Sequence, residues 1–137
     1  MFSFPDCGVL ILYEPYLFLL RKELVFCGYG EPTCALHLML QTARYVKKIH
    51  PQLKLRVNTN GLGNLENRRD IVPDLAQVLD AVSISLNAPD EADYNKVTRP
   101  TLPGAYEAML DFARECRKAI PDTGFISSSF RPKCVTR

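Results

Sequence analysis

The fold is indicated by residues 23–33, which read Glu-Leu-Val-Phe-Cys-Gly-Tyr-Gly-Glu-Pro-Thr. The apolar first half of this stretch, Leu24 to Cys27, predicts a short buried strand. Two glycines then end the strand and leave backbone N–H groups that no side chain covers. Pro32 prevents the strand from continuing. The stretch therefore predicts a strand, a loop able to receive a small polar ligand, and the start of a helix.

Further strands are predicted where apolar and polar residues alternate. This pattern marks strands over 53–58 and 81–87, and another short strand opens at Gly124. Helices are predicted where apolar residues recur three and four positions apart, over 34–50, from Pro73, over 89–96 and over 105–120. Strand–helix alternation at this spacing predicts βαβ units and a parallel sheet.

The sequence also predicts a helix cap and a loop. Thr33 is the expected N-cap of the helix over 34–50, because its hydroxyl can accept a hydrogen bond from the first turn. Residues 62–69, which are polar and charged, are expected to form a loop.

Two of the predicted strands each carry one fully polar face. The polar residues are Lys54, Arg56 and Asn58 in one strand, and Ser83, Ser85 and Asn87 in the other. A solvated antiparallel sheet explains this pattern, and so does a barrel wall whose polar side chains point into a lumen. The intervening helices favour the barrel, since parallel strands need such crossovers. In a barrel, residues 28–31, 58–60 and 87 meet at the C-terminal ends of the strands, where α/β proteins bind ligands.

The composition is that of an ordinary soluble protein. The chain has 137 residues, 47% of them hydrophobic, and a net charge of +2, which is too small to argue for nucleic acid or an anionic membrane. The apolar tract over 8–20 contains Glu14 and Pro15 and is shorter than the roughly 20 residues of a membrane span. Five cysteines without a signal-peptide pattern predict reduced thiols in the cytoplasm.

Several ordered motifs resemble those of radical S-adenosylmethionine (radical SAM) enzymes. Residues 28–32, Gly-Tyr-Gly-Glu-Pro, resemble the GGEP motif of that family, with Tyr29 inserted between the glycines. Residues 58–61, Asn-Thr-Asn-Gly, look like the TNG-type end of the next strand, and residues 82–88 resemble the strand commonly written SISLDA. Tyr94 and Arg99-Pro100 are also familiar from this group. The nearest resemblance is to the TatD family-associated radical SAM proteins.

This resemblance implies a fold, a cofactor and a set of contacts. The implied fold is part of a TIM-type barrel of parallel βα units over residues 23–125, with 1–22 and 126–137 as non-matching ends. The implied cofactor is S-adenosylmethionine, and the intact family also holds a 4Fe–4S cluster. The cofactor-binding residues so implied are Gly28, Tyr29, Gly30, Glu31, Asn58, Asn60, Ser85, Asn87 and Arg99.

The implied contacts divide among the parts of the cofactor. Gly28, Gly30 and Glu31 would hold the amino group of its methionine part. Ser85 and Asn87 would read the ribose hydroxyls, since an amide both donates and accepts hydrogen bonds. Arg99 is suited to the cofactor carboxylate or a substrate anion, or is simply solvated.

The cysteines depart from the family pattern. The CxxxCxxC loop of the family supplies three thiolates to the cluster, whereas the cysteines here lie at positions 7, 27, 34, 116 and 134. A cluster would require Cys7, Cys27 and Cys34 to converge in space, so no metal ligand and no catalytic residue is assigned. Two hypotheses remain: an internal fragment of a radical SAM protein that is inactive alone, and a cluster-less module that binds S-adenosylmethionine, a nucleotide or a partner. The substrate and the oligomeric state are not indicated.

Overall fold

The strand–helix alternation predicted from the sequence is confirmed in the computed structural model, which describes residues 22–28 and 30–127. In chain order the elements are β1 (Glu23–Phe26), the 3₁₀ turn η2 (Pro32–Ala35), α1 (Leu36–Ile49), β2 (Lys54–Thr59), α2 (Gly63–Asn67), α3 (Val72–Ala76), β3 (Ala81–Leu86), α4 (Glu91–Thr98), α5 (Ala105–Ala119) and β4 (Asp122–Ser127). No helix in these ranges is long and apolar enough to cross a membrane.

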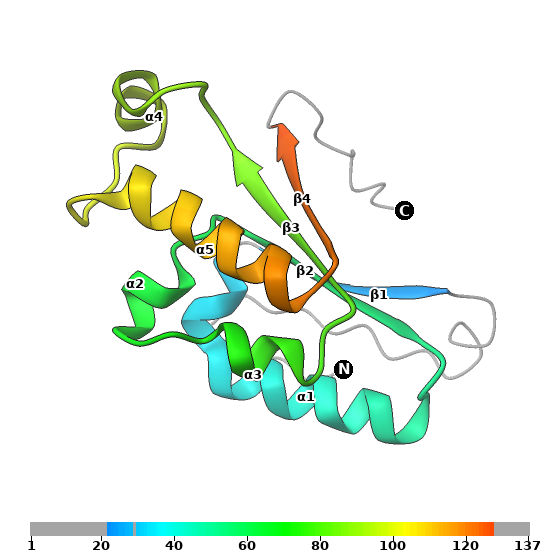
Figure 1. Cartoon of the computed structure of the whole chain (residues 1–137). Coiled ribbons are helices and arrows are strands. Elements are labelled where there is room, and N and C mark those ends of the chain that lie inside the picture. The colour runs from blue at the N-terminus through cyan, green and yellow to red at the C-terminus, as the bar shows by residue number, and fades with distance from the viewer. Residues whose placement is uncertain (1–21, 29, 128–137) are drawn as a thin grey trace, which may run out of the picture.

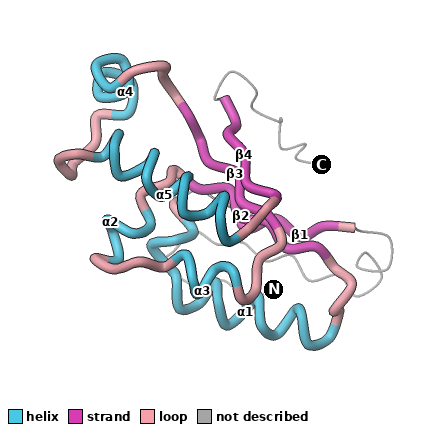
Figure 2. Tube along the Cα trace, viewed as in Figure 1, coloured by secondary structure: helices cyan, strands magenta, loops and turns pink. Residues whose placement is uncertain are grey.

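The four strands form one sheet in the order β1-β2-β3-β4, and each neighbouring pair is parallel. The register pairs Glu23 with Lys54, Arg56 with Ala81, and Ala81 with Asp122. Helices α1, α3 and α5 all lie on one side of this sheet (Figure 1), and the same layering is visible when the chain is coloured by secondary structure (Figure 2). Sequential parallel strands with helices on one side build the wall of a βα barrel. The predicted α/β class is therefore confirmed.

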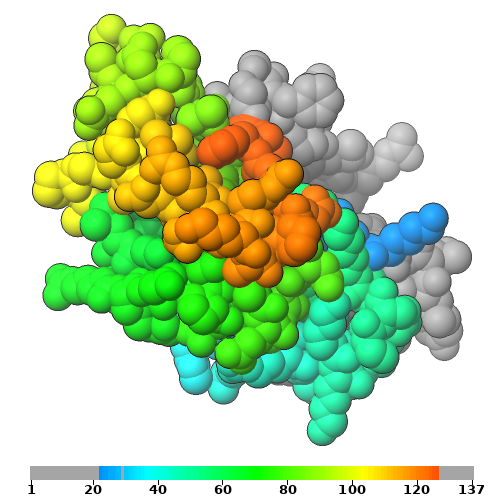
Figure 3. All heavy atoms as spheres, in the orientation of Figure 1, coloured from blue at the N-terminus to red at the C-terminus, as the bar shows by residue number. Residues whose placement is uncertain are grey.

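The core lies between the sheet and the helical layer. Leu55 and Val57 of β2 and Val82 and Ile84 of β3 are completely buried. They pack against apolar side chains of the helices, including Met39, Ala43, Leu75, Met109 and Phe112. In the space-filling view, α1, α2, α3 and α5 form a continuous surface over this side of the sheet (Figure 3).

The opposite face of the sheet is polar at the N-terminal ends of the strands, as the alternation predicted. Arg56 donates from Nε to Glu23 Oε1 at 2.9 Å, from Nη1 to Ser83 Oγ at 2.9 Å, and from Nη2 to Asp122 Oδ2 at 3.3 Å. Lys54 also donates to Asp122. These hydrogen bonds join all four strands across the face. That the face lines a lumen stays a prediction.

A carboxylate also fixes the start of β3 to the core. Asp80 Oδ2 accepts from Lys47 Nζ at 2.5 Å and from the Leu55 N–H at 2.7 Å. Burial acts to raise the pKa of Asp80, but these two hydrogen bonds and the charges of Lys47 and Lys54 outweigh it, so the pKa lies below the usual 3.8.

Two local predictions are wrong. Residues 62–69 are not all loop, because Gly63–Asn67 form α2, which ends at Arg68 in a left-handed conformation. Its last residue fixes this short helix, since Asn67 Nδ2 donates to Gly63 O at 2.8 Å and to Thr33 O at 2.9 Å. Thr33 is not the N-cap of α1 but lies inside η2, whose side-chain cap is Glu31, whereas α1 follows Ala35 without a side-chain cap.

Candidate functional site

The C-terminal ends of β1, β2 and β3 share one edge of the sheet, because the three strands are parallel neighbours. The loop that follows β1 contains Gly28, Gly30 and Glu31, and Asn60 directly follows β2. Asn87 directly follows β3. The fold therefore gives these predicted residues a common edge, which is the edge where parallel sheets bind ligands.

Glu31 ties the loop after β1 to the end of β2. Its Oε1 accepts from Thr33 N at 3.2 Å, from Thr33 Oγ1 at 2.7 Å and from Thr59 Oγ1 at 2.5 Å. Its Oε2 accepts from Asn60 N at 2.8 Å. Thr33 and Thr59 are 0% and 2% exposed, so both hydroxyls depend on protein partners.

The turn after β2 is fixed by its own side chains. Asn60 Oδ1 accepts from Leu62 N at 2.9 Å, and Thr59 Oγ1 accepts from Gly61 N at 3.1 Å. Gly61 has a φ of +80°, which favours glycine. These contacts hold the Asn60 side chain at the mouth of a pocket.

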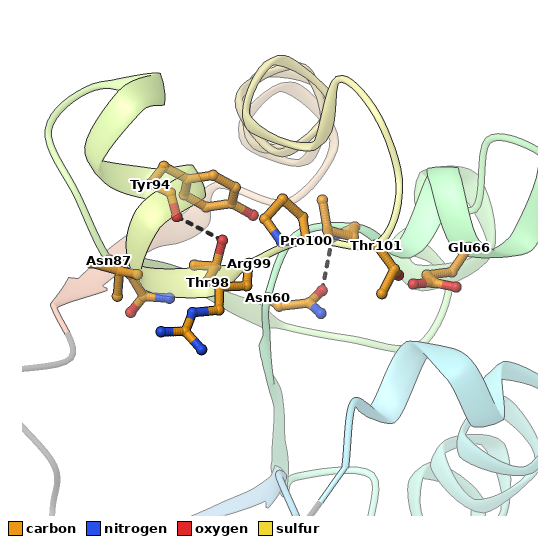
Figure 4. A pocket seen from close by; sticks show the side chains of 10 residues that line it. Asn60, Glu66, Asn87, Tyr94, Thr98, Arg99, Pro100 and Thr101 are labelled. Carbon is orange, nitrogen blue, oxygen red and sulfur yellow. Dashed lines mark hydrogen bonds between the residues drawn. The ribbon is translucent and has the colours of Figure 1, made fainter.

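That pocket has a volume of about 620 Å³ and lies between the ends of β2 and β3, α2 and the segment after α4. Asn60, Asn87 and Arg99 line it, together with Glu66 and Tyr94 (Figure 4). Its volume falls within the roughly 300–1,000 Å³ that is usual for small-molecule sites. Three of the nine predicted cofactor-binding residues therefore meet at one cavity.

Helix α4 positions the arginine of this pocket. The helix ends at Arg99, which has a left-handed backbone (φ +47°) and donates its N–H to Asn95 O at 3.0 Å. Thr98 Oγ1 donates to Tyr94 O at 2.8 Å, as drawn in Figure 4. Burial raises the pKa of the Tyr94 hydroxyl, partly offset by Thr98. The Arg99 side chain lines the pocket, and within the described ranges no ion pair includes it.

The other predicted residues that the structure describes do not line this pocket. Asn58 and Ser85 are partly exposed on the polar face of the sheet, where Asn58 pairs in register with Ser83, and neither lines the pocket. Gly28 and Gly30 are exposed. Tyr29 is outside the described residues. Asn60, Asn87 and Arg99 therefore line the pocket, whereas Asn58 and Ser85 lie apart from it on the polar face of the sheet.

Thr33 and Thr59 are the residues that sequence reasoning missed at this site. Thr59 lies inside the Asn-Thr-Asn-Gly motif, which was assigned to the turn after the strand over 53–58, whereas the structure makes Thr59 the buried last residue of β2. A buried threonine beside two turn-forming asparagines was the available signal, because a buried hydroxyl needs a partner.

The cysteines of the described residues do not fit a 4Fe–4S cluster. Cys27 and Cys34 are exposed, whereas Cys116 is fully buried on α5, where burial raises the pKa of its thiol to about 12. Residues 22–28 and 30–127 contain no group of three His, Cys, Asp or Glu that could hold a metal ion. Cys7 and Cys134 lie outside the described residues, and so does the convergence that would include Cys7.

The family model of the radical SAM superfamily matches residues 16–130. This range extends beyond the 23–125 suggested by the motifs. No curated protein matches the chain. Because the family match covers most of the sequence and the fold is the parallel βα arrangement expected of it, the chain belongs to the radical SAM superfamily.

Proposed function

We propose that the chain binds S-adenosylmethionine at the C-terminal edge of its sheet, as part of a radical SAM unit, and performs no radical chemistry alone. The observation that carries this proposal is the pocket lined by Asn60, Asn87 and Arg99 beside the Glu31 loop, in a member of a family that uses this cofactor. On the motifs at 28–32, 58–61 and 82–88, which resemble those of the TatD family-associated radical SAM proteins, we propose that it belongs to that subgroup.

The proposed contacts follow the chemistry of the cofactor. S-adenosylmethionine carries an ammonium, a carboxylate and ribose hydroxyls. The loop at 28–31 offers main-chain carbonyls to the ammonium, and the guanidinium of Arg99 suits the carboxylate. Asn87 and Ser85 suit the ribose hydroxyls because they both donate and accept hydrogen bonds. Asn58, on the polar face of β2, and Tyr29 are the other proposed contacts.

The proposed inactivity rests on the cysteine spacing. In the family, the cluster supplies the electron that cleaves the cofactor, and three closely spaced thiolates hold it. None of the five cysteines here belongs to a CxxxCxxC motif. We therefore treat residues 23–125 as a partial barrel domain from a cytoplasmic radical SAM protein, flanked by the segments 1–22 and 126–137.

A second candidate is a cluster-less binding module in its own right. The same cysteine spacing favours it, because the cofactor edge is kept while the cluster motif is missing. This module would bind S-adenosylmethionine, a nucleotide or a partner, so binding of S-adenosylmethionine tests the first candidate and the cofactor-binding form of the second.

Calorimetric titration with S-adenosylmethionine is the direct test. We expect saturable binding that Asn87→Ala weakens roughly tenfold, since the loss of one or two hydrogen bonds is worth about 1–2 kcal/mol. Asn95→Ala is the matched control, because Asn95 is an exposed residue of α4 that does not line the pocket. Absence of binding by a sample whose circular dichroism shows the fold would contradict the first candidate and the S-adenosylmethionine-binding form of the second.

Anaerobic reconstitution with iron and sulfide tests the proposed inactivity. We expect no visible charge-transfer absorption to remain with the protein after desalting. A stoichiometric cluster that cleaves S-adenosylmethionine on reduction would show that the chain is an active enzyme.

A further inference from the structure

The carboxylate of Glu31 is almost fully used by the protein itself. A carboxylate has about four acceptor directions on its two oxygens. Three donors surround Oε1, from Thr33 N, Thr33 Oγ1 and Thr59 Oγ1, and Asn60 N occupies Oε2. At most one direction, on Oε2, is left for a ligand.

The donors of these hydrogen bonds have few alternatives. Thr59 Oγ1 already accepts from Gly61 N, so its own proton is directed to Glu31. The Thr33 hydroxyl is completely buried and donates to the same oxygen. A ligand ammonium that displaced these donors would leave buried polar groups without partners, which is unfavourable.

The contact reaches across a long stretch of sequence to a pocket residue. Asn60 is 29 positions from Glu31, and its main-chain N–H is held by Oε2 while its side chain lines the pocket. Movement of the carboxylate would therefore move the turn that carries Asn60.

We propose that Glu31 is a positioning residue that fastens the loop after β1 to the end of β2 and thereby places Asn60, rather than the counter-ion of a ligand ammonium. The ligand in this inference is the S-adenosylmethionine of the proposed function. The attachment of loop to strand does not depend on any ligand, so it is tested separately.

The ligand test uses Glu31→Gln, which keeps the shape of the side chain but places an N–H₂ group against protein donors. Binding of S-adenosylmethionine is compared with binding of its analogue that lacks the α-amino group. We expect both affinities to fall by a similar factor, roughly tenfold, because Asn60 is displaced in both cases. A loss confined to S-adenosylmethionine would identify Glu31 as the ammonium partner and overturn the proposal.

A double-mutant cycle separates positioning from a general effect on stability. If Glu31 acts through Asn60, Glu31→Gln weakens binding much less in an Asn60→Ala background than in the parent chain. The control cycle pairs Glu31→Gln with Asn87→Ala, and its effects should add. Additive effects in both cycles would contradict the proposed route through Asn60.

Thermal unfolding tests the attachment without ligand. Glu31→Gln and Thr59→Val should each lower the unfolding midpoint by several degrees, roughly 5–10 °C, and the double variant should lose less than their sum. The control is Glu115→Gln, whose exposed carboxylate pairs only with Lys118 among the described residues, and which should shift the midpoint little. Additive losses would overturn the attachment.

These measurements distinguish failure of the proposed function from failure of the proposed role of Glu31. If the parent chain does not bind S-adenosylmethionine, the proposed function fails, and the unfolding cycle still decides whether Glu31 holds the loop to β2. If Glu31→Gln does not fold, Thr33→Val, which removes one hydroxyl donor to Glu31 and leaves the contacts of Thr59 with Glu31 and Gly61 in place, replaces it in the binding cycle with Asn60→Ala.

Discussion

Substitution of Gly61 by alanine tests how tightly the turn at the candidate site is packed. Gly61 has a φ of +80°, and a Cβ there would lie 2.7 Å from Met109 Cγ and 3.0 Å from Ile84 Cγ2. Both neighbouring side chains are completely buried, so neither can move into solvent. The substitution therefore combines backbone strain with a steric clash.

The expected magnitude is the balance of three contributions. A left-handed conformation costs an L-residue about 1–2 kcal/mol, and overpacking of a buried site costs about 1–3 kcal/mol. The unfolded chain has less conformational freedom with alanine than with glycine, which offsets about 0.4–1 kcal/mol of this loss. Gly61→Ala should therefore reduce the free energy of unfolding by about 3 kcal/mol, a large part of the roughly 5–15 kcal/mol of a typical domain.

Two other glycines separate the contributions. Gly104 has a φ of +70° but open space within 4 Å of its Cβ position, so Gly104→Ala should show the backbone strain alone, about 1 kcal/mol. Gly124 lies in β4 with open space and no left-handed φ, and Gly124→Ala should change stability by less than about 0.5 kcal/mol. The difference between Gly61→Ala and Gly104→Ala measures the clash.

Urea unfolding followed by circular dichroism gives these free energies from midpoints and slopes. Equal losses for Gly61→Ala and Gly104→Ala would refute the reasoning, because they would mean that Met109 and Ile84 yield without cost. Such softness would also remove the argument that the turn holds Asn60 in one place.

Three further predictions concern other parts of the chain. Arg56→Met should lower the free energy of unfolding in urea by about 1–2 kcal/mol, because Arg56 links β2 to the three other strands. Lys54→Met, which removes one exposed ion pair, should cost less than about 1 kcal/mol. The pKa of Asp80 is lower in the folded state, so this carboxylate contributes stability that is present above pH 3.8 and is lost as the pH falls through the pKa of the folded state. Asp80→Asn should therefore make the urea midpoint decline less steeply in acid. An unchanged decline would argue against this linkage. Cys116 should resist iodoacetamide at about pH 8 until urea unfolds the chain, as measured by peptide mass spectrometry, because its thiol is buried with a pKa of about 12; rapid labelling of the folded protein would contradict its placement.

Much of the fold was predictable because local patterns and long-range packing agree. Alternation in β2 separated Leu55 and Val57 from Lys54 and Arg56, and the structure places the two pairs on opposite faces. Periodicity in α1 and α5 likewise marked the helix faces that are buried. The short helix α2 was not predictable, because Asn67 holds it by a hydrogen bond to the distant Thr33 carbonyl, in addition to one to Gly63 O within the helix.

The edge of the candidate site was predictable, but its internal contacts were not. Gly28–Glu31 and Asn60 end neighbouring strands, which is enough to assign them to one edge. Which donors surround the Glu31 carboxylate depends on how β1 and β2 are packed, across 28 positions of sequence between Glu31 and Thr59. The sequence motif shows that a glutamate is present, whereas only the structure shows that its carboxylate accepts hydrogen bonds from two threonine hydroxyls.

The sequential order of the strands bears on how the sheet assembles. Pairing Glu23 with Lys54, Arg56 with Ala81 and Ala81 with Asp122 closes segments of 31, 25 and 41 positions. Closure entropy grows only with the logarithm of length, so these crossovers differ by about 0.4 kcal/mol at most. Chain connectivity therefore does not favour any one pair of strands as the first to form. The pair that buries the most apolar surface is expected to form first. The central pair, β2 and β3, whose apolar side chains Leu55, Val57, Val82 and Ile84 are completely buried, is the expected nucleus, to which β1 and β4 add as outer strands.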